Sequence, residues 1–155
     1  MPTRFALFIG CMLWLASCSI YGDAQTSDRL APDTSWELIL LDVEGTRIVP
    51  ERDRLGQRMP DMHFAPSDAG AQTLAVHGFL GCNLFSGTAR IDGESVQFTE
   101  LTQTEIACQP YPAQVEGRYS EALQHIDAYS IVDETLTLRY DRGVLTFRPA
   151  VPASN

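Results

Sequence analysis

Lysine is missing from this sequence of 155 residues, and all 11 basic residues are arginines. The absence excludes every mechanism that depends on a lysine, whether as a Schiff base, as the phosphate-binding residue of a nucleotide loop or as a general base. The G-x-S-x-G turn of many serine hydrolases and the glycine-rich fingerprint of dinucleotide-binding proteins are absent as well. No common catalytic motif therefore identifies a reaction.

Histidine is scarce, and negative charge exceeds positive charge. There are three histidines, His63, His77 and His125. They lack the i, i+4 spacing of a metal-binding pair on a helix, and no C-x-x-C motif lies beside them. We therefore expect no metal, no cofactor and no catalytic residue. The formal net charge is −9, with 20 acidic residues, and carboxylate pairs among so many acids indicate surface charge. Because an acidic chain repels nucleic-acid phosphates, we expect no nucleic-acid partner.

The first 18 residues resemble a bacterial lipoprotein signal. Arg4 precedes an apolar run, Phe5–Leu15, that is too short to cross a bilayer with a tilt. The small residues Ala16 and Ser17 then precede Cys18, whose sulfur can receive a diacylglyceryl group. We expect residues 1–17 to be removed and Cys18 to anchor the protein to the membrane. An ordinary cleaved signal, with this cysteine incidental, and an uncleaved signal anchor are the alternatives.

Ser19 follows the expected lipid-bearing cysteine at a position where an inner-membrane retention signal usually has Asp. By analogy with lipoprotein sorting, we expect the protein in the bacterial cell envelope, at the outer membrane and facing the periplasm. Residues 18–34 are rich in Ser, Asp, Ala, Thr and Pro without apolar periodicity, which predicts a lipid anchor and a flexible tether. Residues 35–150 are long enough for one domain with a single core.

Short β-type runs recur between turn signals along the rest of the chain. They predict strands at Trp36–Asp42, Met62–Ala65, Thr73–Gly78, Leu84–Ile91, Ser95–Leu101, Thr135–Tyr140 and Val144–Arg148. Hairpin turns are expected at Asp92-Gly93 and Asp141-Arg142-Gly143. Apolar residues three and four apart predict one amphipathic helix over Ala113–Tyr129, entered by a loop with Pro110 and Pro112. The expected fold class is α+β: a curved antiparallel β-sheet, open and barrel-like, packed around the helix.

Several motifs follow one another in a recognisable order. They are Trp36-Glu37-Leu38, Gly81-Cys82-Asn83-Leu84-Phe85-Ser86-Gly87, Thr104-Glu105-Ile106-Ala107-Cys108, a helix with Glu116, and a final hairpin from Leu136 to Phe147. Together they resemble the META domain family, which includes HslJ-like heat-inducible bacterial lipoproteins. The resemblance implies a structural role for the motif residues Trp36, Gly81, Asn83, Phe85, Gly87 and Thr104.

Two features depart from the family pattern. Leu84 and Glu105-Ile106 stand where relatives often have Arg and Arg-Met, and the arginine-rich stretch Arg47–Pro60 has no counterpart in the pattern. We expect this stretch to be a solvated surface loop, and contact of its arginines with anionic lipid headgroups is the alternative. The resemblance implies a role in stress response, envelope integrity or antibiotic tolerance, without an accepted catalytic activity.

Cys82 and Cys108 are the two thiols that remain once Cys11 is removed with the signal and Cys18 is lipidated. Because the bacterial envelope is oxidising, we expect the two to form a disulfide. Two buried, reduced cysteines that serve as small apolar residues are the alternative. A catalytic cysteine would need a histidine base beside it, and the sequence does not define that distance.

Three hypotheses of function follow. The first is a non-enzymatic lipoprotein that binds a partner protein or an apolar ligand through its sheet, and it predicts an exposed apolar groove or strand edge. The second is a hydrolase that acts on an envelope polymer or a small molecule, which requires that His63, His77 and an acid converge. The third is a chaperone-like stability factor for other envelope proteins, without a defined pocket.

Overall fold

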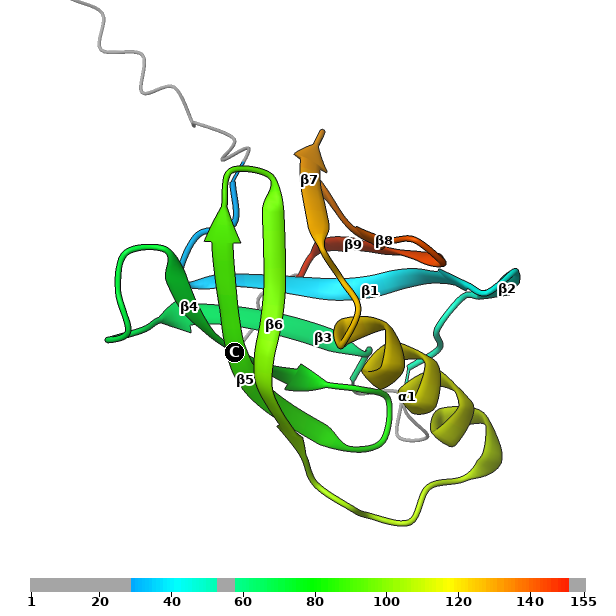
Figure 1. The fold of residues 1–155 in the computed structure, drawn as a ribbon. Helices are drawn as coiled ribbons and strands as arrows, with labels where there is room; N and C mark the ends of the chain where they lie inside the picture. Colours follow the sequence, from blue (N-terminus) through cyan, green and yellow to red (C-terminus); the bar gives the residue numbers. More distant parts are fainter. Residues whose placement is uncertain (1–28, 53–57, 151–155) are drawn as a thin grey trace, which may run out of the picture.

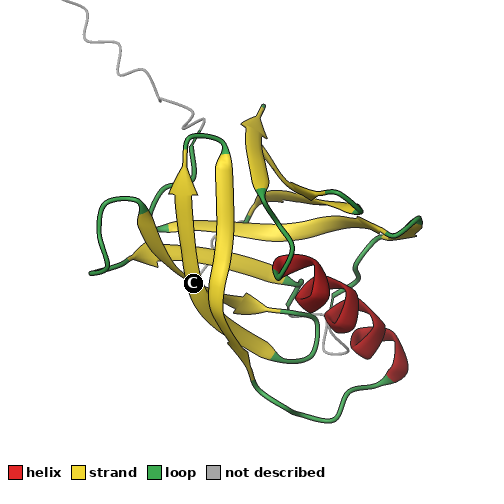
Figure 2. Ribbon diagram, in the orientation of Figure 1, coloured by secondary structure: helices red, strands yellow, loops and turns green. Residues whose placement is uncertain are grey.

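The structure is a computed structural model that describes residues 29–52 and 58–150 (Figure 1). Within these residues the chain forms nine strands and one helix, which Figure 2 distinguishes by colour. They are β1 (Thr34–Val43), β2 (Thr46–Ile48), β3 (Asp61–Pro66), β4 (Thr73–Phe79), β5 (Leu84–Asp92), β6 (Ser95–Gln103), α1 (Pro110–Leu123), β7 (Ala128–Val132), β8 (Thr135–Tyr140) and β9 (Gly143–Pro149). Cys18 and the predicted signal and tether through residue 28 lie outside the described residues.

Eight of the strands close an antiparallel barrel. The strand order is β1-β3-β4-β5-β6-β7-β8-β9, and β9 pairs back with β1 from Trp36↔Pro149 to Val43↔Gly143. On its other edge β1 pairs with β3 through its first half and with β2 through its second half. The predicted α+β class and barrel-like curvature are confirmed, but the predicted open sheet is wrong. The pairing of β1 with β9 closes the ring. The alternation of apolar and polar side chains within a strand does not indicate which strands pair with each other, so the sequence pattern could not predict this closure.

All seven predicted strands are present, with ends within two residues of the prediction. The two predicted hairpins are present as well. Gly93-Glu94 connects β5 to β6 with a positive φ of 59° at Gly93, and Asp141-Arg142 connects β8 to β9. The barrel has one weak seam, because β6 and β7 share a single residue pair, Ser95↔Ala128.

Alternate side chains of the strands fill the barrel interior. The largest fully buried side chains are Tyr119, Phe64, Phe147, Leu38, Leu41, Met62, Leu80, Leu123, Leu136, Leu138, Leu145 and Val43. Complete burial of an aliphatic or aromatic side chain contributes about 1.5–3 kcal/mol relative to its exposure, so this packed interior is the main source of stability.

Helix α1 covers one end of the barrel (Figure 2). Its buried face consists of Val115, Tyr119, Ala122 and Leu123. The Tyr119 ring packs edge-on against Phe85, with 6.0 Å between ring centroids, and its hydroxyl donates to the backbone oxygen of Asp61 at 3.3 Å. Burial, together with the charge of Asp61, raises the pKa of Tyr119 well above its ordinary value, so this hydroxyl stays protonated and donates.

The helix differs from the prediction at both ends. It begins at Pro110, inside the predicted entry loop, because the first helical position needs no N–H donor. It ends at Leu123, and the chain then turns into β7, which the sequence analysis did not predict. Ile126 and Tyr129 are buried, as the helical pattern predicted, but Tyr129 lies on β7 opposite Leu138. Burial of these two residues is compatible with a longer helix and with a strand after the helix, so the spacing of apolar residues could not distinguish the two structures.

Two other boundaries differ as well. The predicted loop Arg47–Pro60 begins inside strand β2, which forms because Glu44 and Gly45 both have positive φ (51° and 73°), as in a type I′ hairpin. Residues 29–34, assigned to the tether, belong to the domain, since Leu30 is buried and Thr34 opens β1. No helix with the length and apolar character needed to cross a membrane occurs in the described ranges.

Two glycines lead to opposite expectations for the same substitution. A Cβ on Gly78 would lie 2.7 Å from Phe85 Cε1 and closer still to the backbone oxygen of Asp61, whereas a Cβ on Gly117 in α1 would meet nothing within 4 Å. We expect Gly78→Ala to lower the free energy of unfolding by about 1–3 kcal/mol through overpacking. We expect Gly117→Ala to raise it by about 0.5–1 kcal/mol through helix propensity. Urea unfolding followed by circular dichroism measures both, and equal shifts in the two variants would contradict the packing described here.

Candidate functional site

Asn83 forms a buried hydrogen-bond node where three segments of the chain meet. Its residue exposure is 2%. Its backbone N–H donates to Glu116 Oε2 at 2.8 Å, and its Nδ2 donates to Glu116 Oε1 at 3.0 Å and to Ile106 O at 3.1 Å. Its Oδ1 accepts bonds from Thr104 Oγ1 at 2.8 Å and Ile106 N at 2.7 Å. The node therefore joins the turn before β5, the loop after β6 and helix α1.

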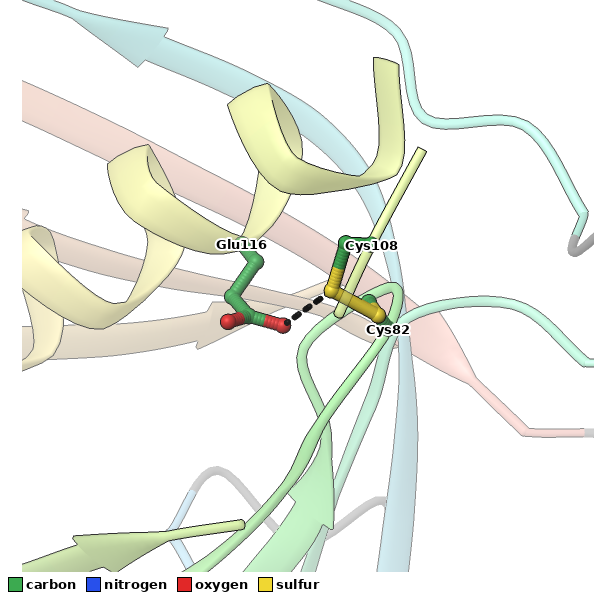
Figure 3. Close-up of side chains that lie close together, drawn as sticks. All are labelled: Cys82, Cys108 and Glu116. Carbon is green, nitrogen blue, oxygen red and sulfur yellow. Dashed lines mark hydrogen bonds between the residues drawn. A yellow bond between two sulfur atoms is a disulfide. The ribbon is translucent and has the colours of Figure 1, made fainter. Parts of the chain in front are cut away.

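A disulfide between Cys82 and Cys108 lies next to this node (Figure 3). Their Cα atoms are 6.0 Å apart and the bond closes a separation of 26 residues. The predicted disulfide is thus present, and the alternative of two reduced cysteines is wrong. Glu116 Oε2 lies 3.7 Å from Cys108 Sγ, which is a close contact in the oxidised protein, because a disulfide sulfur carries no proton to donate.

The same three residues, Cys82, Cys108 and Glu116, form a group of potential metal ligands whose atoms all lie within 4.8 Å of one another. Metal ions bind cysteine as the thiolate, and the disulfide removes both thiolates. For the same reason Cys82 cannot be a nucleophile in this state. The region therefore has a structural role, and chemistry must be sought elsewhere.

The remaining motif residues are structural as well. Trp36 and Phe85 belong to the core, and Thr104 Oγ1 also accepts the backbone N–H of Leu84 at 3.1 Å. Gly81 has a φ of 113° and packs against α1, where a Cβ would lie 3.4 Å from Val115. A Cβ on Gly87 would lie 2.9 Å from the backbone oxygen of Thr99, across a bulge between β5 and β6.

Two of the three histidines come together on the outer face of β3 and β4. His63 and His77 are directly opposite in the strand register, and their rings stack with centroids 5.3 Å apart and an interplanar angle of 16°. Ser35 Oγ lies 2.6 Å from His63 Nδ1, and Asp61 Oδ1 lies 3.5 Å from His63 Nε2. His125 lies apart and stacks on Tyr140. This cluster is not visible in the sequence, because only the strand register places residues 35, 61, 63 and 77 side by side.

Asp61 is also the partner of Arg58. The guanidinium donates to both carboxylate oxygens, at 2.8 Å and 3.0 Å, and its Cζ lies 4.8 Å from the centre of the Phe79 ring. The backbone N–H of Phe79 donates to Asp61 Oδ1 at 2.9 Å. This carboxylate is therefore held firmly in one orientation, facing His63.

A groove lies between β6 and α1, at the weak seam of the barrel. Its volume is about 510 Å³. The apolar lining residues are Leu80, Phe85, Phe98, Leu101 and Leu123, and the polar ones are Thr99, Glu100, Thr102, Gln103, Ser120 and Gln124. Ser120 Oγ donates to Gln103 Oε1 at 3.0 Å across the groove. Leu80, Phe85, Phe98 and Leu123 belong to the buried core, so the surface that this groove exposes is mostly polar. The strand edge that borders the groove is the feature that a binding protein could use.

Removal of the Asn83 side chain tests the node. We expect Asn83→Ala to lower the free energy of unfolding by about 2–4 kcal/mol, because it leaves the Ile106 N–H and Glu116 Oε1 without their buried partner, although the backbone N–H of residue 83 keeps its bond to Glu116 Oε2. Gln114→Ala, at an exposed position of α1, is the matched control and should change stability by less than about 0.5 kcal/mol. Thermal and urea unfolding measure both, and a loss below 1 kcal/mol for Asn83→Ala would contradict the role assigned to the node.

Comparison with known proteins places this fold among solved structures. An NMR structure of a protein from Burkholderia xenovorans is 26% identical with a TM-score of 0.61, covering 77% of this chain and 83% of that chain. A second NMR structure is 19% identical with a TM-score of 0.54, covering 74% of this chain and 87% of that chain, and it shows likeness of fold alone. The sequence matches none of the curated proteins. A model of the META domain matches residues 28–152, which include every motif residue described above, and the chain therefore belongs to the META domain family.

Proposed function

We propose that this chain is a non-enzymatic lipoprotein of the bacterial cell envelope whose META domain binds an extended segment of a partner protein along the free edge of β6. Its role is in envelope stress or drug tolerance, as the family implies. The single observation that carries the binding proposal is the seam of the barrel, where β6 pairs with β7 at Ser95 alone and then runs on to Gln103.

The free edge of β6 offers backbone groups to a partner. Thr104 N donates to Leu84 O of β5 and Gln103 pairs with Phe85, so alternation along the strand directs the N–H group of Gln103 away from β5. Glu100, with a φ of 54°, interrupts the edge with a bulge. The segment Leu101–Gln103 is therefore the part of the edge that suits addition of a partner strand.

The groove provides a surface for the side chains of such a partner. Alternate side chains of an extended segment point to opposite faces. One set would lie in the groove beside Gln103 and Ser120, over the buried side chains of Phe98 and Leu123, and the other would face solvent. The packed barrel interior argues for this surface, and against an internal site, as the place where a ligand binds.

The position of Arg29 and Leu30, the first described residues, supports this use of the groove. Arg29 and Leu30 line a hollow with Gly93 at one end of the barrel, whereas α1 lies toward the other end of β1, where Arg118 pairs with Glu44 at 2.8 Å (Figure 1). The ten positions from 19 to 28 span at most about 35 Å. A lipid on Cys18 would thus hold the N-terminal end of the barrel near the membrane and leave the α1 end facing the periplasm.

The hydrolase hypothesis has one observation in its favour, the contacts among Ser35, His63 and Asp61. A serine nucleophile also needs N–H donors for the oxyanion. Ser35 lies inside the β1 ladders, where it pairs with His63 and its oxygen accepts from Ala150 N, so neighbouring backbone groups are engaged in the sheet. Asp61 is engaged by Arg58. We therefore assign the cluster no catalytic role.

A bulky charged residue in the groove tests partner binding. A phage-displayed library of random seven-residue peptides, selected on the wild-type protein, should yield binders. We expect Ser120→Arg to weaken them at least tenfold by filling the groove. Gln114→Arg makes the same charge change on the same helix at an exposed position outside the groove lining, and it should leave binding unchanged. Failure to select binders, or binders that tolerate Ser120→Arg, would refute the proposed docking edge.

Intact mass spectrometry of the protein purified from native membranes tests the anchor. We expect a mass reduced by residues 1–17 and increased by acyl chains, and both changes should disappear in Cys18→Ala. Reduction should add two hydrogens, from the disulfide. An uncleaved chain, or one that is trimmed without acylation, would be incompatible with a lipoprotein.

A further inference from the structure

The outer face of β3 and β4 carries a group of side chains that neither the core nor the proposed docking edge uses. His63 and His77 stand opposite each other in the register, and Asp61 lies two residues before His63 on the same face. The His63 side chain is 32% exposed and that of Asp61 is 11% exposed. The strand register places His77, and the ring contact with His63 is the interaction of its side chain in the described part of the chain.

We propose that His63, His77 and Asp61 bind a divalent transition-metal ion of the Zn²⁺ class, with water completing the coordination. Imidazole and carboxylate are ligands that suit Zn²⁺, and three protein ligands with an open fourth position are an established arrangement for it. The net charge of −9 favours the approach of cations to this surface.

The distance between two of the ligand atoms fits a tetrahedral ion. Ligand nitrogen and oxygen atoms lie about 2.0–2.2 Å from Zn²⁺, so two of them at the tetrahedral angle are about 3.3–3.5 Å apart. His63 Nε2 and Asp61 Oδ1 are 3.5 Å apart. These two groups therefore need almost no movement to share an ion. His77 is exposed, and its ring, stacked 5.3 Å from that of His63, must rotate out of the stack to bring a nitrogen to the ion.

The surroundings hold the first two ligands in place. Ser35 Oγ lies 2.6 Å from His63 Nδ1, so Nδ1–H can donate to it and leave Nε2 free for the ion, which is the usual second contact of a metal-bound histidine. Asp61 Oδ1 already accepts from Phe79 N and Arg58 Nη2. The ion displaces the Nη2 contact, while Arg58 Nε stays on Oδ2. Competition with the guanidinium lowers the affinity without removing the site.

Zinc titration of the full-length protein tests the site. The chelator-stripped protein, in detergent micelles and without reductant, is titrated with ZnCl₂ by isothermal calorimetry. We expect one ion per chain and at least a tenfold weaker affinity in both His63→Ala and His77→Ala. Ser35→Ala, which removes a positioning residue and no ligand, should weaken binding about tenfold. His125→Ala is the matched control, since this histidine stacks on Tyr140 away from the cluster, and it should bind like the wild type.

Thermal melts without zinc show that each variant is folded, and zinc should raise the melting temperature of the wild type and of His125→Ala. Absence of binding to the wild-type protein would overturn the proposal. It would also be overturned if folded His77→Ala bound as tightly as the wild type, or if His125→Ala lost affinity to the same extent as His63→Ala.

Discussion

The hydrogen bonds of Asn83 are the interaction on which the helix end of this molecule depends. Strand ladders hold the barrel wall, but they do not hold the turn before β5, the loop after β6 or the start of α1. Asn83 connects all three through Glu116, Ile106 and Thr104, and the disulfide from Cys82 to Cys108 adds a covalent link at the same place. Because the amide is buried, every one of its bonds must be made inside the protein.

Closure of the barrel determines which surfaces remain available. When β9 pairs with β1, the backbone groups at what would be the two outer edges are satisfied, and an open sheet is avoided. The price is the seam between β6 and β7, where one residue pair joins the strands and α1 takes the place of the missing ladder. The groove and the unpaired edge are therefore direct consequences of how the helix enters the fold.

Part of this organisation was predictable from local patterns, and part was not. The alternation of Leu136, Leu138 and Tyr140 correctly predicted β8, and the oxidising compartment correctly predicted the disulfide of Cys82 and Cys108. The helix end was wrong because Tyr129 is buried in either a helix or a strand. The stacked pair of His63 and His77 was not predictable, because it depends on the register between β3 and β4.

The sequence by itself determined seven of the nine described strand segments, two hairpin turns, the two cysteines of the disulfide and the membership of the META domain family. These properties follow from neighbouring residues, through side-chain alternation, glycine conformations and short motifs. The tertiary structure alone decided the closure of the ring, the bonds between Asn83 and Glu116, the histidine cluster and the free edge of β6. Each of these joins residues that are distant in the chain, as Trp36 and Pro149 are, and so depends on how the whole chain packs.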